Sequence, residues 1–295
     1  MSTLLITGAT GNVGMEVLKA LSQHKHPHSV IAGARKPQES TQLAPLCHHI
    51  RPFDFTDSGT YGTALQGVDV LFLLRPPHIS EVKTYFAPLV QEAKKAGVKH
   101  IVFLSVQGAA TSSFIPHHKI EKLIETSRIP YTFLRPAYFM QNFTTTLLDD
   151  IRLRRQLYVP AGNAPFSLID VIDIGKVAAR VLANPELYRN NAYDLTNNEL
   201  LTFEQMADKL SKVTSTPIRY RSPNLLAFFV AKRRQKLPVM LILVMIMLHY
   251  LPRFKSAPPR SAWVEKITGE PPRTFNDFLQ DNMACFSSLQ TASEN

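Results

Sequence analysis

The amino-acid sequence predicts an α/β fold of the Rossmann type, a doubly wound parallel sheet with a smaller, mostly helical C-terminal substrate region. Three observations lead to this prediction. An apolar segment at residues 3–7 runs into a glycine-rich turn and then an amphipathic stretch. Further short apolar runs alternate with segments of helical periodicity through the first half of the chain. These runs are apolar without interruption, as expected for a parallel sheet that is covered on both faces.

The expected elements follow this alternation. Strands are predicted at residues 3–7, 30–34, 49–53, 70–74, 100–104 and 131–134. Helices are predicted after the glycine turn and near residues 57–66, 80–96 and 117–127. Helices of this length between strands indicate parallel pairing through right-handed crossovers.

The pattern is looser after Pro136. It predicts a helix at residues 139–155, a helix that begins at an Asp173 N-cap, a strand at 192–195 and a helix at 203–213 capped by Thr202. We expect residues 1–150 to form an NAD(P)-binding Rossmann core. Residues 151–295 are expected to supply late core elements and a smaller substrate-binding cap.

The glycine-rich turn predicts a dinucleotide site. Its glycines, Gly8, Gly11 and Gly14, have G-x-x-G-x-x-G spacing. Gly8 allows a turn with positive φ, Gly11 lets the backbone approach a phosphate, and Gly14 allows close packing of helix on strand. The helix N-terminus then faces the pyrophosphate. The candidate cofactor-binding residues of this turn are Gly8, Thr10, Gly11, Asn12, Val13 and Gly14.

The end of the second strand favours NADP(H) over NAD(H). NAD-binding Rossmann units place a carboxylate there for the ribose 2′-hydroxyl. This chain has Arg35 and Lys36 instead, and a guanidinium can bind a 2′-phosphate through two hydrogen bonds. A solvated basic loop is the alternative interpretation.

Other candidate cofactor contacts lie where strands end. Asp54 could accept from the adenine amino group and Phe55 could lie along the ring, although Asp54 could equally cap its own turn. Leu74, Arg75 and Pro76 end the fourth strand at the carboxyl edge, where ligands bind. Arg75 could reach a phosphate or form a structural contact. Pro136, at the end of the sixth strand, completes this candidate set.

Composition limits the other function classes. The formal net charge is +10, but no basic stripe interleaved with aromatic residues indicates nucleic-acid binding. The two cysteines are far apart in sequence, no signal peptide is recognised, and a reduced cytoplasmic location is expected. No histidine spacing indicates a metal site. The sequence leaves a monomer or a homodimer undecided.

The most apolar run, residues 237–251, is too short to span a membrane. We expect no transmembrane segment, and a buried helix lining a pocket. The alternative is a peripheral membrane anchor at residues 232–251, because a basic cluster precedes the apolar run.

Several segments together resemble the NmrA-like, or atypical short-chain dehydrogenase-reductase, family. They are residues 7–14 (TGATGNVG), 96–105 (AGVKHIVFLS), 129–143 (IPYTFLRPAYFMQNF), 195–203 (LTNNELLTF) and 267–275 (ITGEPPRTF). Within the family the chain resembles the branch of triphenylmethane reductase and bacterial NADPH:quinone reductases. The resemblance implies a Rossmann core, NADP(H) and a cleft over the nicotinamide.

The sequence departs from short-chain dehydrogenases at the catalytic residues. Ser105 lies where the family serine is expected, but the Tyr-x-x-x-Lys positions fall on Ser113 and His117. Three readings remain open. Hydride could pass directly to a small flat acceptor such as a quinone, His117 or Lys119 could donate a proton, or the chain could be a non-catalytic NADPH/NADP sensor with a protein partner. The candidate substrate-binding residues follow the sixth strand: Tyr138, Phe139, Asn142 and Phe143.

Overall fold

The computed structural model describes residues 1–77 and 79–287. These residues form two compact units, each assembled from separated stretches of chain. Unit 1 comprises Met1–Ala137, Val171–Thr196 and Ala262–Pro271. Unit 2 comprises Tyr138–Asp170, Asn197–Ser261 and the described residues from Pro272 onward. Residue 150, the expected end of the cofactor-binding core, lies in unit 2.

Unit 1 contains a seven-stranded parallel sheet in the order β10-β6-β5-β4-β1-β2-β3, which confirms the predicted fold class. Its strands are β1 (Thr3–Ile6), β2 (Ser29–Ala34), β3 (His49–Pro52), β4 (Val70–Leu74), β5 (His100–Leu104), β6 (Tyr131–Pro136) and β10 (Asn191–Leu195). The strand order reverses between β1 and β4, and parallel sheets bind ligands at the carboxyl side of such a switch point.

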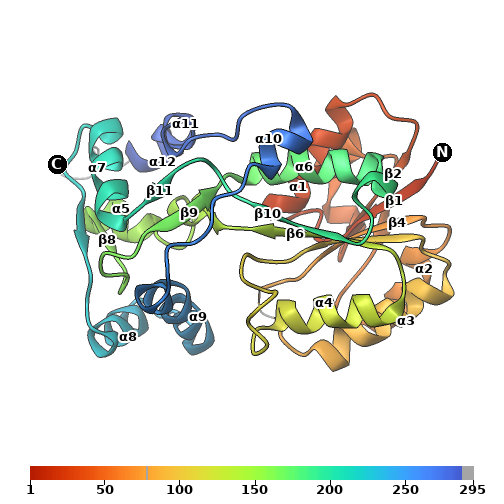
Figure 1. The fold of residues 1–295 in the computed structure, drawn as a ribbon, viewed down its shortest axis with the longest axis horizontal. Coiled ribbons are helices and arrows are strands. Elements are labelled where there is room, and N and C mark those ends of the chain that lie inside the picture. Colours follow the sequence, from red (N-terminus) through yellow and green to blue (C-terminus); the bar gives the residue numbers. More distant parts are fainter. Residues whose placement is uncertain (78, 288–295) are drawn as a thin grey trace. The chain divides into compact units, whose positions relative to one another are not determined.

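Helices cover both faces of this sheet (Figure 1). One face carries α1 (Asn12–Gln23) and α6 (Val171–Ala183), which pack against each other. The other face carries α2 (Tyr61–Leu65), α3 (Ala87–Lys95) and α4 (Pro116–Ser127). A π-helix at Val82–Phe86 leads into α3, and α10 (Trp263–Thr268) packs on α6. Two-sided coverage explains why the inner strands β1, β4 and β5 are largely apolar, whereas the edge strand β3 (HIRP) is not.

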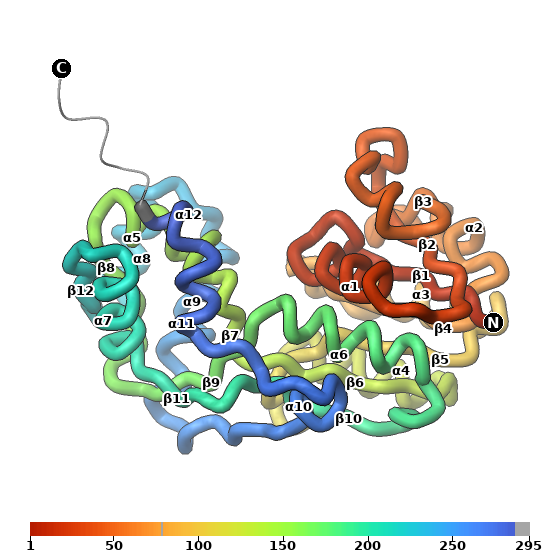
Figure 2. Tube along the Cα trace, turned by 90° about the horizontal axis from the view of Figure 1, so that it is seen from above, coloured from red at the N-terminus to blue at the C-terminus, as the bar shows by residue number. Residues whose placement is uncertain are grey.

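Unit 2 combines two small sheets with a set of helices. Its strands are β7 (Tyr138–Phe139), β8 (Gln156–Tyr158), β9 (Phe166–Ile169), β11 (Leu200–Leu201) and β12 (Arg219–Arg221). Its helices are α5 (Leu148–Arg154), α7 (Phe203–Thr214), α8 (Leu225–Arg234), α9 (Val239–Tyr250), α11 (Phe275–Asp281) and α12 (Met283–Ser287). Figure 2 shows α11 and α12, in blue, beside α7, with which both are in contact. Their apolar residues share one core with α5, α7 and α9.

The predicted cap of α7 is confirmed. Thr202 Oγ1 accepts from the Gln205 amide, and the Gln205 side chain accepts from the Thr202 amide. This reciprocal pair satisfies two amides that the first turn of a helix leaves without a backbone partner.

Three expected elements of the later chain are wrong. Residues 139–155 do not form one helix, because β7 pairs with β9 and a 3-10 turn at Met140–Phe143 precedes α5. Asp173 is not an N-cap, since α6 begins two residues earlier at Val171. The apolar run at 237–251 is not a buried helix: of α9 only Ile242, Met245 and His249 are buried.

Candidate functional site

The glycine turn in unit 1 forms a close-packed cradle at the start of α1. Gly8 has a φ of +63°, and the Gly11 amide donates to the Gly8 carbonyl over 2.9 Å. A Cβ on Gly14 would lie 2.2 Å from the Gly8 oxygen, so only glycine fits between strand and helix there. The helix begins at Asn12 with no side chain capping its first amides and no acidic residue in its first turn. Such an N-terminus suits an anionic phosphate, and the residues present therefore fit a dinucleotide.

A threonine ties the end of β1 to β4 beside this cradle. The buried Thr7 hydroxyl donates to the Phe72 carbonyl over 2.9 Å and accepts from the Leu74 amide over 3.0 Å. Of the predicted turn residues, Thr10, Gly11 and Asn12 are exposed, whereas Val13 is buried against the core. The exposed members are therefore those free to meet a ligand.

The two cations after β2 differ in their surroundings. Both Arg35 and Lys36 are exposed. Lys36 Nζ forms an ion pair with Glu39 over 2.8 Å. An exposed ion pair of this kind is weak, so both cations stay candidates for the predicted NADP(H) preference, and Arg35 is the one that can bind a phosphate through two hydrogen bonds.

Asp54 and Phe55 support the chain between β3 and α2. Asp54 Oδ1 accepts from the amide and the hydroxyl of Thr56, each over 2.8 Å. The Phe55 ring is buried and packs edge-on against Phe53, 4.8 Å between ring centroids. Their predicted contact with adenine stays a prediction.

Arg75 holds the loop after β4 and reaches α4. Its Nη1 donates to the carbonyls of Pro76 and Ile79, over 3.1 and 2.5 Å. Its Nε donates to His117 Nε2 over 3.2 Å. Burial lowers the pKa of the Arg75 guanidinium.

His117 is therefore a neutral hydrogen-bond acceptor at Nε2, because a guanidinium can only donate. Burial, followed by the positive charge of Arg75, lowers the His117 pKa to about 3. The imidazole stays uncharged near neutral pH, so this geometry does not supply an imidazolium proton donor. Lys119, the other candidate donor, is exposed on the same helix.

Ser105 belongs to a buried polar network. Its hydroxyl donates to Glu121 Oε1 over 2.5 Å. Arg135 binds both oxygens of the same carboxylate, through Nε over 2.9 Å and Nη2 over 2.7 Å. Asp194 also faces Arg135, and burial raises its pKa. The network joins the ends of β5, β6 and β10 to α4.

Sequence reasoning missed Glu121 and Arg135 as members of this network. Glu121 is 3% exposed and lies between the buried Ile120 and Ile124. A carboxylate on the apolar face of a helix was the available signal, because a buried carboxylate needs a partner. Pro136 ends β6 beside the network, where its carbonyl accepts from the Gln107 amide over 2.9 Å.

The candidate substrate residues lie in unit 2. The Tyr138 hydroxyl is 2.9 Å from His249 Nε2, and His249 Nδ1 is 2.6 Å from the Met245 carbonyl. Nδ1 therefore donates and Nε2 accepts. Burial lowers the His249 pKa to about 4 and raises the Tyr138 pKa. Phe143 is fully buried, whereas Phe139 and Asn142 are partly exposed.

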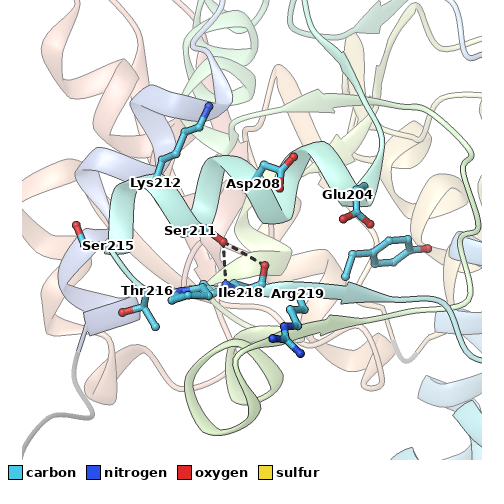
Figure 3. A pocket seen from close by; sticks show the side chains of 10 residues that line it. Glu204, Asp208, Ser211, Lys212, Ser215, Thr216, Ile218 and Arg219 are labelled. Carbon is cyan, nitrogen blue, oxygen red and sulfur yellow. Dashed lines mark hydrogen bonds between the residues drawn. The ribbon is translucent and has the colours of Figure 1, made fainter.

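Unit 2 also has a groove between α7 and β12 (Figure 3). The Ser211 hydroxyl lies at its base and hydrogen-bonds to the backbone of Ile218, accepting from the amide over 2.8 Å and donating to the carbonyl over 3.1 Å. Acidic and basic side chains both line it, namely Glu204, Asp208, Lys212 and Arg219. Mixed charge without a convergent set of donors does not point to one ligand.

A sequence model of the NmrA-like family matches residues 1–238. The chain belongs to the NmrA-like family. NAD(P)H azoreductase of Xenophilus azovorans is 31% identical over 294 residues, covering 97% of this chain and 99% of that protein. Quinone oxidoreductase 2 of Escherichia coli (strain K12) is 27% identical, covering 80% and 82%. The names of these relatives confirm, at the level of the family, the prediction of an NAD(P)H-dependent reductase.

The fold has a close counterpart among solved structures. Triphenylmethane reductase of Citrobacter sp., crystallised with NADP(H), superposes with a TM-score of 0.83 at 24% identity. The match covers 95% of this chain and 99% of that protein. At this identity the likeness establishes the fold.

Proposed function

We propose that this NmrA-like chain is an NADPH-dependent reductase that transfers hydride to a small flat acceptor such as a quinone. The observation that carries the proposal is the cradle of Gly8, Gly11 and Gly14 at an uncapped helix start, with the exposed Arg35 at the end of the next strand. The names of the azoreductase and quinone oxidoreductase relatives support the acceptor class.

The chain's own residues contribute binding and orientation. The first amides of α1 bind the pyrophosphate, and Arg35 binds the 2′-phosphate. Bound NADPH supplies the hydride. Because His117 is neutral and already accepts from Arg75, the proton that completes reduction of the acceptor comes from solvent rather than from this imidazole. The positioning of acceptor against cofactor then supplies most of the rate.

Cofactor choice tests the first half of the proposal. Calorimetry measures the binding of NADPH and NADH to the unchanged protein and to two variants. Arg35→Glu is the test variant. Lys25→Glu is the control, because it reverses the charge of an exposed lysine between α1 and β2. A charged hydrogen bond contributes roughly 1.5–3 kcal/mol, so Arg35→Glu should weaken NADPH binding roughly ten- to a hundredfold. Lys25→Glu should not. Equal affinities of the unchanged protein for both cofactors would refute the preference.

Turnover tests the second half. Loss of NADPH absorbance is followed with quinones, azo dyes and aldehydes as acceptors. We expect quinones or azo dyes to be reduced and aldehydes to be poor acceptors. Hydride addition to an aldehyde gives a strongly basic alkoxide that needs a positioned proton donor, whereas a quinone gives a delocalised hydroquinone anion that can take its proton from water. Tight NADPH binding with no turnover on any acceptor would instead favour the NADPH/NADP sensor, which the missing Tyr-x-x-x-Lys relay makes the second candidate. A partner whose binding differs between NADPH and NADP would then be sought.

A further inference from the structure

The hairpin of α8 and α9 in unit 2 exposes an unusual amount of apolar surface. Its inner side is held in the core by Phe228 of α8 and by Ile242 and Met245 of α9. The large apolar side chains that the hairpin and the following 3-10 turn (Leu251–Phe254) leave exposed form what we call the outer apolar face: Leu226, Val230, Val239, Met240, Leu241, Leu243, Val244, Leu248, Leu251 and Phe254. Contiguous apolar patches on soluble domains usually mark interaction sites.

The same segment is strongly cationic. Residues 225–260 contain seven lysines and arginines and no aspartate or glutamate. Lys232 points inward and pairs with the buried Asp150. The other six are all exposed: Arg233, Arg234, Lys236, Arg253, Lys255 and Arg260. Two groups of exposed cations, at residues 233–236 and 253–260, therefore flank the apolar run of α9, with no negative charge between them.

The length of α9 indicates how the face can be covered. Its 12 residues extend about 18 Å at a rise of ~1.5 Å per residue, whereas a bilayer core is about 30 Å thick. Among the residues that the structure describes, no helix is long and apolar enough to cross a membrane. α9 is apolar on nearly every side, and its cations lie outside it, at residues 232–236 before the helix and 253–260 after it. Binding of such a segment at a membrane surface depends on the apolar area that it buries and on the attraction of its flanking cations to anionic lipid.

We propose that the outer apolar face docks on a membrane surface that contains anionic phospholipid. The apolar side chains enter the boundary between headgroups and acyl chains, and the six exposed cations meet lipid phosphates. If a second copy of this chain covered the face instead, its six exposed cations would lie against the six of the first copy, and this repulsion between like charges would cost free energy. Nucleic acid would satisfy the charges but leave the apolar side chains in water.

Vesicle flotation of the full chain tests the proposal. The vesicles are phosphatidylcholine alone, or phosphatidylcholine mixed with phosphatidylglycerol. We expect binding to the mixed vesicles, much weaker binding to neutral ones, and weakening by salt. Arg234→Gln with Lys255→Gln should lower partitioning roughly thirtyfold, because each surface cation contributes about a factor of five. Met240→Ser with Val244→Ser should lower partitioning on both compositions.

Matched variants keep the result specific. Leu187→Ser removes an equally exposed apolar side chain from unit 1, and Lys25→Gln with Lys83→Gln removes two exposed lysines there. Both should bind vesicles as the unchanged protein does, and circular dichroism confirms that each variant is folded. No binding to the mixed vesicles would overturn the proposal. Equal losses of vesicle binding in the unit 1 variants would also overturn it. A third contradicting result would be self-association of the protein that the Met240 and Val244 changes abolish, with no vesicle binding.

Discussion

Arg75 Nε donates a hydrogen bond to His117 Nε2 over 3.2 Å, and this bond determines the chemical state of the imidazole. The guanidinium has no lone pair to offer, so Nε2 must be unprotonated. The pKa of about 3 agrees with this geometry. The residue that sequence spacing predicts at the lysine position of the ordinary dehydrogenase relay is therefore a hydrogen-bond acceptor, and its donor Arg75 also binds the carbonyls of the loop after β4.

This relationship predicts how His117 responds to substitution. His117→Gln keeps an acceptor for Arg75, so NADPH oxidation should change only a few-fold and its pH profile between about pH 5.5 and 8.5 should keep its shape. His117→Leu leaves the guanidinium without this partner, which costs roughly 1–3 kcal/mol of unfolding free energy. Steady-state rates and urea unfolding check both. A hundredfold loss of turnover in His117→Gln would instead identify a general acid.

Gly175 predicts a second, purely steric effect. A Cβ there would lie 2.7 Å from the Glu16 carbonyl, where α6 crosses α1. Gly175→Ala should therefore lower the free energy of unfolding by about 1–3 kcal/mol through overpacking. Gly62→Ala is the matched control, because its Cβ would meet only the Glu92 side chain at 3.7 Å. Unfolding in urea should show the first variant weakened and the second unchanged or slightly stabilised.

The buried pair of Lys232 and Asp150 predicts a non-additive result. Lys232→Met leaves the carboxylate with Arg154 and Gln235 but without its buried cation, and should cost about 3 kcal/mol of unfolding free energy. Adding Asp150→Asn removes the stranded charge and should recover much of that loss. Lys122→Met, which breaks an exposed pair with Glu125, should change stability little. Additive losses in the double variant would contradict this account.

Three histidines whose pKa values are lowered by burial predict loss of stability in mild acid: His100, His249 and His117, whose pKa is about 3. The pKa values of His100 and His249 are both lowered to about 4 by burial, while the unfolded chain protonates near 6.5. Between these values the unfolded state binds more protons, so the free energy of unfolding falls as pH drops from 6.5 toward 4. At pH 5 each group lowers the free energy of unfolding by about 2 kcal/mol relative to neutral pH. In urea titrations at several pH values, His100→Gln should flatten this slope, whereas the exposed His24→Gln should not.

Local signals predicted most of unit 1. A few adjacent residues determine the strand–turn–helix around Gly8 to Gly14, and the same holds for each buried strand. The Thr202 cap in unit 2 is equally local. Residues 139–155 could not be assigned in this way, because β7 exists only through pairing with β9, some thirty residues later. The Ser105–Glu121–Arg135 network likewise depends on three elements meeting, and no single stretch of sequence contains it.

The outer apolar face was mispredicted for a related reason. An apolar run normally signals burial, and residues 237–251 are the most apolar of the chain. The number of neighbours available to cover a helix is a tertiary property, and α9 contributes only three fully buried side chains to the core. The basic cluster at residues 232–236, directly before the apolar run, was the sequence signal for the peripheral alternative.

The interleaving of the two units has a consequence for how this protein can be made. A polypeptide that stops at residue 150 would lack β10, which pairs with β6, and α6, which packs on α1. It would present β6 as a bare edge and one sheet face without its second helix. During synthesis unit 1 cannot be completed until residue 271 has left the ribosome. Unit 1 thus reaches its final form only late in synthesis, although its glycine-rich turn precedes almost all of the elements that complete it.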